Sequence, residues 1–287
     1  MRIARLLLCA LGSLALSARA DGQALYAATA SGGPGELFIL NPANGAVVQD
    51  VGPLNDANGV NYGITGLAFH PITGVLYGSV ANNNPATRAQ LVTIDPATAR
   101  VTVVGPYNAG NPGTTPTTMA DLAFTASGSL FGVGSVGGPQ LYSINTATGQ
   151  ATVVGSSGLT STGGGGLAVS PADVFYGTPT STRFGTYNST TGVYTNITDP
   201  VKPAGGAYAA LDFDGSGVLY GLNSGAGAPP PTHLVTFDPA TGAITDLGAS
   251  VNSLDAIAFR PVPEPGAVLL VLAPVVAGLL IRARCRR

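Results

Sequence analysis

The sequence predicts an all-β protein, a β-propeller with five four-stranded blades. Three observations lead to this prediction. Four short segment types recur five times in the same order along the middle of the chain. Each segment is rich in β-branched and aromatic residues and is bounded by Gly, Pro, Asn or Asp, which is typical of strands. No stretch of the repeats shows a sustained helical period, and four strands repeated every 44 to 54 residues are the signature of propeller blades.

The first two segment types predict two adjacent strands of each blade. The first is an apolar-aromatic pair that is usually followed by Gly. It occurs at 25–26, 76–78, 130–132, 175–177 and 219–221. The second alternates in polarity and ends in a turn, as in LVTFDPATG. It occurs at 37–45, 91–99, 141–149, 184–192 and 234–242.

The other two segment types predict the outermost and the innermost strand of each blade. The third type, as in VTVVG, occurs at 47–52, 101–105, 151–155, 193–197 and 243–248. The fourth, as in LAF, occurs at 67–69, 122–124, 167–169, 211–213 and 257–259 and is placed innermost by analogy with other propellers. Because the repeats begin with the first type and end with the fourth, the last inner strand should complete the N-terminal blade. This closure removes free sheet edges.

The Asp/Asn-Pro-Ala-Thr-Gly tract at the end of the second segment is interpreted as a structural turn. Pro suits the first corner of a type I turn, Gly the following left-handed position, and the Asp or Asn side chain caps the turn. We therefore assign no metal or catalytic role to this tract.

Both ends of the chain differ from the repeats. Arg2 and Arg5 precede an apolar run from 6 to 16, and Ala18-Arg19-Ala20 matches a signal-peptidase site. Residues 1–20 are therefore predicted to be a secretory signal peptide, and 21–261 the propeller. The two cysteines lie outside the segment 21–265, so the predicted exported domain contains no disulfide.

The C-terminal 26 residues have three ordered parts. Pro263-Glu264-Pro265 comes first, an uncharged apolar run from 266 to 281 follows, and a basic tail from 282 to 287 ends the chain. The run spans about 24 Å as a helix, which is a marginal membrane span. Residues 262–287 closely resemble the PEP-CTERM sorting signal of Gram-negative bacteria. The resemblance implies transient contact with the inner membrane, cleavage near the motif by an exosortase-type enzyme, and a destination in the cell envelope or on the cell surface. A plain membrane anchor is the alternative.

The repeats resemble those of extracellular YVTN-type propellers, which have a similar texture around the Leu-Tyr pair and the Asp-Pro turn. Proteins with PEP-CTERM-like tails are associated with extracellular polysaccharide and biofilm matrix, so the resemblance implies a matrix polysaccharide as a partner. The segment 21–265 holds all 14 acidic residues and only five basic ones, a net charge of −9. Such a domain should not bind nucleic acid.

A meander places alternate connections at opposite ends of the blades. The turns after the innermost strand and the Asp/Asn-Pro turns are short and share one face, whereas the other connections are long and share the opposite face. Function on such scaffolds lies on long loops, so we expect any ligand there. The candidate residues are Asp56, Asn58, Asn61, Tyr62, Tyr107, Asn108, Asn111, Tyr208 and His233. The alternative is that they are ordinary solvated loop residues.

Three carboxylates, Asp121, Asp212 and Asp255, lie in or beside the predicted inner strands. They are expected to be hydrated channel residues, with cation binding or acid-base chemistry as the alternative. Asp212 and Asp214 also resemble the start of a calcium loop, but the distal acidic ligand is missing. No cofactor is expected, with calcium as the alternative.

Catalytic motifs are absent from the sequence. It contains no G-x-S-x-G, H-E-x-x-H or P-loop pattern, and its two histidines, His70 and His233, should lie on opposite faces. The sequence therefore favours an exported, non-enzymatic binding or structural protein of the cell surface. A secreted hydrolase or lyase that uses channel carboxylates such as Asp121 and Asp255 is the alternative.

Overall fold

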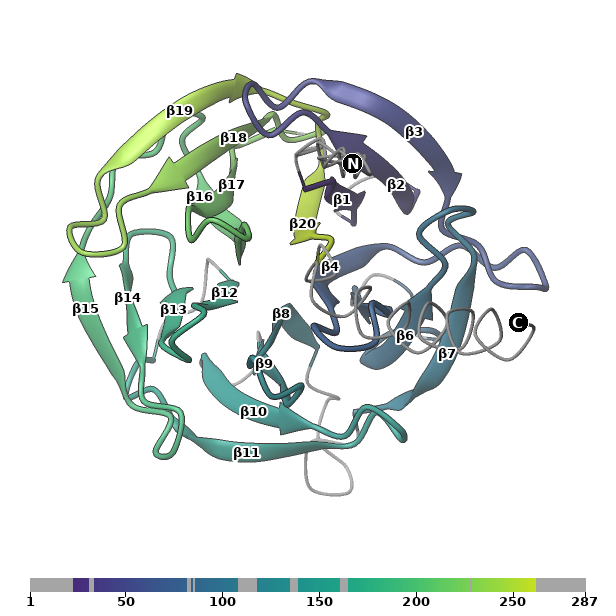
Figure 1. Cartoon of the computed structure of the whole chain (residues 1–287), viewed down its shortest axis with the longest axis horizontal. Helices are drawn as coiled ribbons and strands as arrows, with labels where there is room; N and C mark the ends of the chain where they lie inside the picture. Colours follow the sequence, from purple (N-terminus) through teal and green to yellow (C-terminus); the bar gives the residue numbers. More distant parts are fainter. Residues whose placement is uncertain are drawn as a thin grey trace, which may run out of the picture.

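The computed structural model describes residues 23–30, 34–81, 84, 86–107, 118–134, 139–160, 165–227 and 229–261. These residues form twenty strands in five four-stranded antiparallel sheets, which surround a central axis as five blades (Figure 1). The predicted five-bladed propeller is confirmed. No helix among the described residues has the length and apolar character needed to cross a membrane.

The blades are numbered in chain order, and their strands are given from the axis outwards. Blade 1 contains β20 (Leu254–Phe259), β1 (Leu25–Thr29), β2 (Glu36–Leu40) and β3 (Val47–Pro53). Blade 2 contains β4 (Ile64–Phe69), β5 (Leu76–Val80), β6 (Gln90–Ile94) and β7 (Val101–Pro106). Blade 3 contains β8 (Met119–Phe124), β9 (Leu130–Gly134), β10 (Gln140–Ile144) and β11 (Ala151–Ser156).

The last two blades follow the same order. Blade 4 contains β12 (Gly166–Val169), β13 (Phe175–Thr178), β14 (Phe184–Tyr187) and β15 (Tyr194–Thr198). Blade 5 contains β16 (Ala207–Phe213), β17 (Leu219–Ser224), β18 (Thr232–Phe237) and β19 (Ile244–Ala249). The four segment types of the sequence are thus the four strands of each blade.

The ring is closed by pairing between the two ends of the propeller. β20 pairs antiparallel with β1, with Phe259 opposite Leu25 and Ile257 opposite Ala27. The predicted closing strand is confirmed. It ties the C-terminal strand into the first blade by main-chain hydrogen bonds, so every blade has a partner on both sides.

The core consists of five clusters, each shared by two neighbouring blades. In four of the five, an aromatic residue of the second strand packs against the Phe that ends the inner strand of the next blade. These pairs are Tyr26 with Phe69, Tyr77 with Phe124, Tyr176 with Phe213, and Tyr220 with Phe259, at ring-centroid distances of 4.8 to 5.6 Å. The recurring Leu-Tyr and Leu-Ala-Phe motifs are therefore the two halves of the contact between blades.

The Gly after the aromatic pair is required by packing within the blade. At Gly221, an added Cβ would lie 2.6 Å from Cε2 of Phe237 on the neighbouring strand. A side chain on this face of the strand would displace a ring that belongs to the core.

The Asp/Asn-Pro turns have the predicted geometry. The side chains of Asn41 and Asp238 each accept a main-chain N–H from two residues further on, at 2.9 and 2.8 Å, and Gly45 and Gly242 have φ angles of 70° and 69°. In the second repeat, Ala99 takes the left-handed position with a φ of 57°. The structural interpretation of these turns is confirmed.

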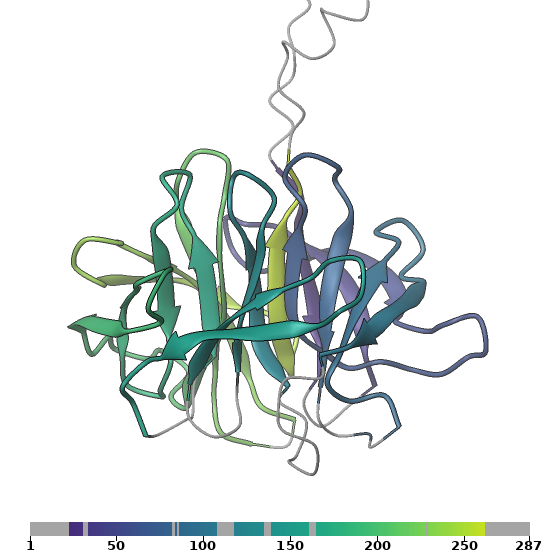
Figure 2. The ribbon, with the colours of Figure 1, turned by 90° about the horizontal axis from the view of Figure 1, so that it is seen from below.

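The connections fall on two faces, as the meander requires (Figure 2). The short-turn face carries the turns between the first two and the last two strands of each blade, and the long-loop face carries the other connections. β1 begins and β20 ends at the short-turn face, so Gln23 and Pro261, the first and last described residues of the propeller, lie there. Both ends of the described propeller therefore lie on the short-turn face.

Candidate functional site

On the long-loop face, the connection from β3 to β4 is held together by its own polar side chains. The side-chain amide of Asn61 donates to the Gly35 carbonyl oxygen at 2.9 Å, and its oxygen accepts the Gly35 N–H at 2.6 Å. Asp56 accepts the N–H groups of Asn58 and Val60 at 2.8 and 2.9 Å. Both residues therefore shape the loop, and Asn58 is exposed beside them.

Electrostatics in this loop agree with its hydrogen bonds. The main-chain N–H of Val60 holds the pKa of Asp56 below its ordinary value. The hydroxyl of Tyr62 donates to Asp56 at 3.2 Å, and burial followed by the nearby Asp56 charge raises the pKa of Tyr62. Tyr62 is only 4% exposed, so it belongs to the core and supports the loop from below.

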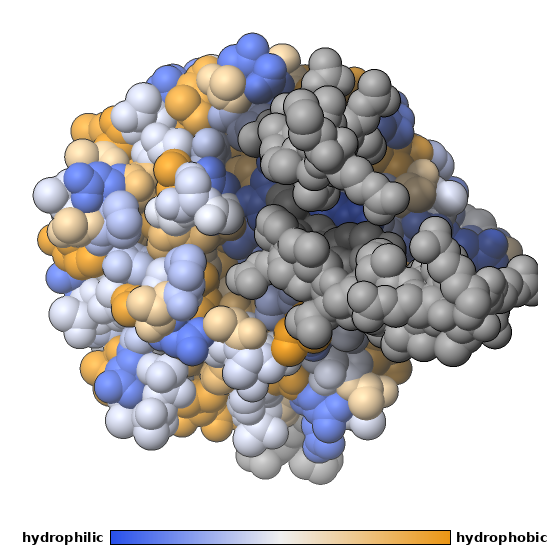
Figure 3. Space-filling view, viewed as in Figure 1, coloured by the Kyte–Doolittle hydropathy of each residue, from blue (hydrophilic) through white to orange (hydrophobic). Residues whose placement is uncertain are grey.

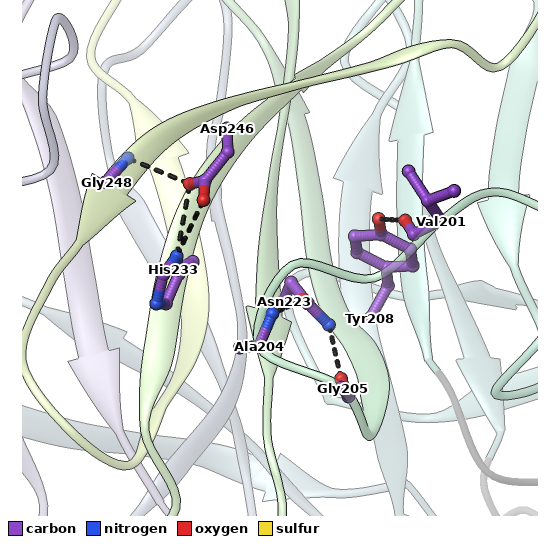
Figure 4. Close-up of polar contacts among 8 residues, drawn as sticks. All are labelled: Val201, Ala204, Gly205, Tyr208, Asn223, His233, Asp246 and Gly248. Carbon is purple, nitrogen blue, oxygen red and sulfur yellow. Dashed lines mark hydrogen bonds and ion pairs between the residues drawn. The ribbon is translucent and has the colours of Figure 1, made fainter.

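The loop that enters blade 5 is held in a similar way (Figure 4). Tyr208 is buried at the start of β16, and its hydroxyl donates to the Val201 carbonyl oxygen at 2.5 Å. The buried Asn223 accepts the Ala204 N–H at 2.7 Å and donates to the Gly205 carbonyl oxygen at 2.8 Å. The role of Asn223 in holding this loop was not predicted from the sequence. An amide directly after the mostly apolar segment 219–222 is nevertheless a signal that its side chain binds main-chain groups.

Tyr62 and Tyr208, which were predicted to contact a ligand, are thus core residues, and Tyr107 is a core residue as well. Tyr107 is fully buried after β7, and burial raises the pKa of its hydroxyl, an effect only partly offset by the neighbouring Ser79 hydroxyl. The expectation that Tyr62, Tyr107 and Tyr208 contact a ligand or solvent on the loop surface is wrong, because their rings fill the space beneath the loops. Asn108 and Asn111 lie outside the described residues.

His233 lies on β18 near the long-loop face and pairs with Asp246 on β19 (Figure 4). Nδ1 of His233 lies 3.0 Å from the nearer carboxylate oxygen, and the two side chains are 26% and 37% exposed. Asp246 also accepts the Gly248 N–H at 2.9 Å. His70 lies in the β4–β5 turn on the opposite face, so the two histidines cannot share a site.

The central channel carboxylate Asp121 is not hydrated, contrary to expectation. It is fully buried on β8. One of its oxygens accepts the N–H of Leu122 at 2.9 Å, and the other accepts the N–H groups of Leu167 and Leu211 at 2.9 and 3.0 Å. Leu167 and Leu211 lie on the inner strands of blades 4 and 5, so one side chain joins the inner strands of three blades. The physical reason is that inner strands have no further strand to pair with, and their N–H groups require acceptors.

The other two channel candidates are partly exposed. Asp212 on β16 accepts the N–H of Phe213 at 2.9 Å and that of Phe259, on the closing strand, at 2.7 Å. Asp255 lies on β20 towards the long-loop face. The three carboxylates therefore do not share one level of the channel. Their positions on the inner strands were predicted, but their partners were not.

Burial dominates the electrostatics of the two inward carboxyl groups. It raises the pKa of Asp121 well above its ordinary range and that of Asp212 to about 7, although the main-chain hydrogen bonds lower both pKa values. The nearby Asp212 raises the pKa of Asp121 further, and Asp214 does the same for Asp212. Both groups therefore bind a proton more tightly in the folded chain than in the unfolded chain.

We expect the free energy of unfolding to fall as the pH rises from about 4 to about 7. A carboxyl group whose folded pKa is raised stabilises the fold below its unfolded pKa, and this contribution is lost as the pH approaches the folded pKa. After allowance for its partial exposure, Asp212 should account for roughly 2 to 3 kcal/mol of this loss. Urea denaturation between pH 4.5 and 7.5 measures it.

The matched variant for this prediction is Asp212→Ala. Its free energy of unfolding should fall clearly less than that of the wild type over the same pH interval. Asp56, Asp95 and Asp238, whose pKa values are lowered by main-chain hydrogen bonds, titrate below this interval and do not mask the effect. An unchanged pH slope in Asp212→Ala would contradict the assignment.

The calcium candidates, Asp212 and Asp214, both accept hydrogen bonds from the main chain. One carboxylate oxygen of Asp214 accepts the N–H groups of both Ser216 and Val218, at 2.9 and 2.8 Å. Within the part of the chain that the structure describes, no three His, Cys, Asp or Glu side chains come together to hold a metal ion. The processing residues, Ala18, Ala20, Pro263, Glu264 and Pro265, lie outside the described residues.

The five sheets, together with the Asp121 carboxylate that joins three inner strands at the axis, define a five-bladed β-propeller assembled from an internal repeat. The chain belongs to a family described as "Repeat of unknown function (DUF6923)", whose model matches residues 42–228. No curated protein matches the chain.

Solved structures resemble the chain at the level of the fold. A gluconolactonase from Xanthomonas campestris is 14% identical, with a TM-score of 0.49 over 82% of this chain and 80% of that one. TolB from Acinetobacter baumannii is 12% identical, with a TM-score of 0.43 over 84% and 67%. A protein of unknown function from Bacteroides thetaiotaomicron is 16% identical, with a TM-score of 0.44 over 78% of this chain, which spans half of that protein's length.

Proposed function

We propose that the protein is an exported binding propeller of the cell envelope or cell surface, which presents its long-loop face to an extracellular polysaccharide. One observation carries the proposal: both ends of the propeller leave from the short-turn face (Figure 2). A chain attached to the envelope through residues after Pro261 would then direct the long-loop face outwards. The signal peptide and the PEP-CTERM-like tail belong to the same proposal, with an exosortase-type enzyme as the processing partner.

The architecture of the long-loop face supports a recognition role. Asn61 and Asn223 bind the main chain of the loops through several hydrogen bonds each, and Tyr62 and Tyr208 support the loops from the core. Loops held in this way lose little conformational entropy when a ligand binds. Asp121, the carboxylate on which the alternative enzyme would depend, has both oxygens occupied by main-chain N–H groups. This favours binding over acid-base catalysis in the channel.

The test is a binding array of matrix polysaccharides and glycans, probed with the full-length protein in detergent, with and without calcium. Two exposed apolar residues provide a matched pair of variants. Val201 on the long-loop face is 72% exposed, and Ile72 on the short-turn face is 73% exposed. We expect Val201→Glu to weaken polysaccharide binding about tenfold through repulsion and lost contact, and Ile72→Glu to leave it unchanged.

Two outcomes would contradict the proposal. One is an array without any retained polysaccharide. The other is equal loss of binding in Ile72→Glu and Val201→Glu, which would place the contact away from the long-loop face. Cleavage of a polysaccharide by the wild-type protein would instead support the hydrolase or lyase alternative.

A further inference from the structure

A pocket lies where the axial channel opens on the short-turn face, opposite the long-loop face. It has a volume of about 230 Å³, and all five blades contribute to its lining. Gln23 and Pro261, at the two ends of the propeller, also line it. The side-chain oxygen of Gln23 accepts the N–H of Gly215 across the rim, between blades 1 and 5. The pocket is smaller than those that hold drug-sized ligands, so its ligand must be small.

The walls of the pocket are mostly aromatic and apolar. They include the residues that end four of the inner strands, together with alanines one residue earlier: Phe69, Phe124, Phe213, Phe259, Ala68 and Ala123. Outside the pocket, hydrophilic and hydrophobic residues are interspersed over the part of this face that is coloured in Figure 3. The aromatic rings are held in place by contacts with the neighbouring blade, as in the pair Tyr220 and Phe259 at 4.8 Å.

One carboxylate reaches this pocket from the channel. Asp212 is opposite Tyr220 in its blade, a register position that is occupied by alanine in the four other blades: Ala68, Ala123, Ala168 and Ala258. Four repeats thus form the same strand with alanine, and the fold does not require a carboxylate there. Each oxygen of Asp212 accepts one main-chain N–H and retains a further acceptor position.

The charged side chains that line the pocket have one sign. Among the lining residues, Asp212 and Asp214 are the charged ones, and none is a cation. Asp214 is occupied by the turn at 214–218, whereas Asp212 is partly exposed. An ammonium group placed against Asp212 would gain a charge-assisted hydrogen bond, and its apolar body would contact rings whose faces attract cations.

We propose that this axial pocket binds a small organic cation, with its ammonium group hydrogen-bonded to Asp212 and its apolar body packed against the ring of phenylalanines. The site lies on the opposite face from the proposed polysaccharide surface and does not depend on it. An anion would be repelled by Asp212 and Asp214, and a polyhydroxylated sugar would leave most of its hydroxyl groups without partners against the apolar walls.

The test uses benzylammonium as the probe and isothermal titration calorimetry on the full-length protein in detergent. It is run at a pH of about 8, where Asp212, whose pKa is raised to about 7, is ionised. Benzyl alcohol and benzoate have similar shapes and serve as neutral and anionic probes. We expect saturable binding of benzylammonium, at least tenfold weaker binding of benzyl alcohol, and no binding of benzoate. Asp212→Ala, which places the residue of the four other repeats at this position, should weaken benzylammonium binding at least tenfold. Asp212→Asn, which keeps the shape of the side chain, provides a second variant with the same expected loss.

The matched control is Asp238→Asn. Asp238 lies in an Asp/Asn-Pro turn on the same face but outside the pocket, and Asn occupies the equivalent position in three other repeats, at Asn41, Asn145 and Asn188. This variant should bind benzylammonium as the wild type does. Absence of saturable benzylammonium binding, or equal affinity for benzylammonium in wild type and in a folded Asp212 variant, would overturn the proposal. Equal binding of benzyl alcohol would show an apolar pocket without cation recognition and would overturn it as well.

Discussion

Replacement of Asp121 by Ala is expected to lower the free energy of unfolding by about 3 kcal/mol or more. Its carboxylate accepts the N–H groups of Leu122, Leu167 and Leu211, which belong to three different blades. Each buried N–H that loses its acceptor costs about 1 to 3 kcal/mol, and the gain from no longer burying an acidic group offsets only part of this. No steric problem arises, because the other inner strands have Gly66, Gly166, Ala210 and Ala256 at this register position.

Urea denaturation at pH 7 measures this loss. Asp246→Ala is the control, since it removes an exposed carboxylate that also accepts hydrogen bonds, from His233 and Gly248, and should cost about 1 kcal/mol or less. If Asp121→Ala costs no more than the control, the three N–H groups have found water as a partner, and the carboxylate does not hold the blades together.

The second large effect concerns a close approach between the turn after β10 and the outer strand of the neighbouring blade. Gly149 has a φ of 78°, and an added Cβ would overlap the carbonyl oxygen of Gly105 in the outer strand of blade 2. A Cβ on Gly105 would in turn overlap the Thr148 carbonyl oxygen. The same close approach of two main-chain segments recurs between Gly192 and Gly155. Gly149→Ala should therefore destabilise the fold by roughly 3 kcal/mol or more, because it forces two main-chain segments apart.

Gly74→Ala is the matched control for Gly149→Ala. Gly74 has a similar φ of 68°, but nothing lies within 4 Å of its added Cβ. It should cost only about 1 kcal/mol, the penalty of placing Ala in a left-handed conformation. The difference between the two variants in thermal or chemical denaturation isolates the contact between blades. Equal losses would show that backbone conformation alone makes Gly149 necessary.

The fold was predictable in detail because the information for it is local and repeated. The Leu-Tyr pair, the Asp/Asn-Pro turn and the Leu-Ala-Phe segment recur five times, so the alternation and turn chemistry of one repeat are supported by four others. The turn of the second repeat shows that the pattern tolerates a residue other than Gly at the left-handed position. Ala99 replaces Gly at a φ of 57°, and its side chain packs in the core cluster of Leu54 and Val101.

The candidate site was predictable only in its position along the chain. Polar residues in a long loop have the same sequence signature whether they face solvent, as Asn58 does, or hold the loop from within, as Asn61 does. Tyr62, Tyr107 and Tyr208 were assigned to the loop surface because they lie between strands, yet each fills a gap beneath the loop. Burial of a loop residue depends on what packs against it from other blades, and no local pattern encodes this.

The sequence by itself determined the strand order, the five blades, the closing strand and the two faces, since each follows from periodicity and turn residues within about fifty positions. Only the tertiary structure decided what the inward carboxylates do. Asp121 meets Leu167 and Leu211 at separations of 46 and 90 residues, and Asp212 meets Phe259 at 47. These contacts exist because ring closure brings five inner strands together at one axis, where their unpaired N–H groups need acceptors. The same closure forms the pocket at the short-turn face.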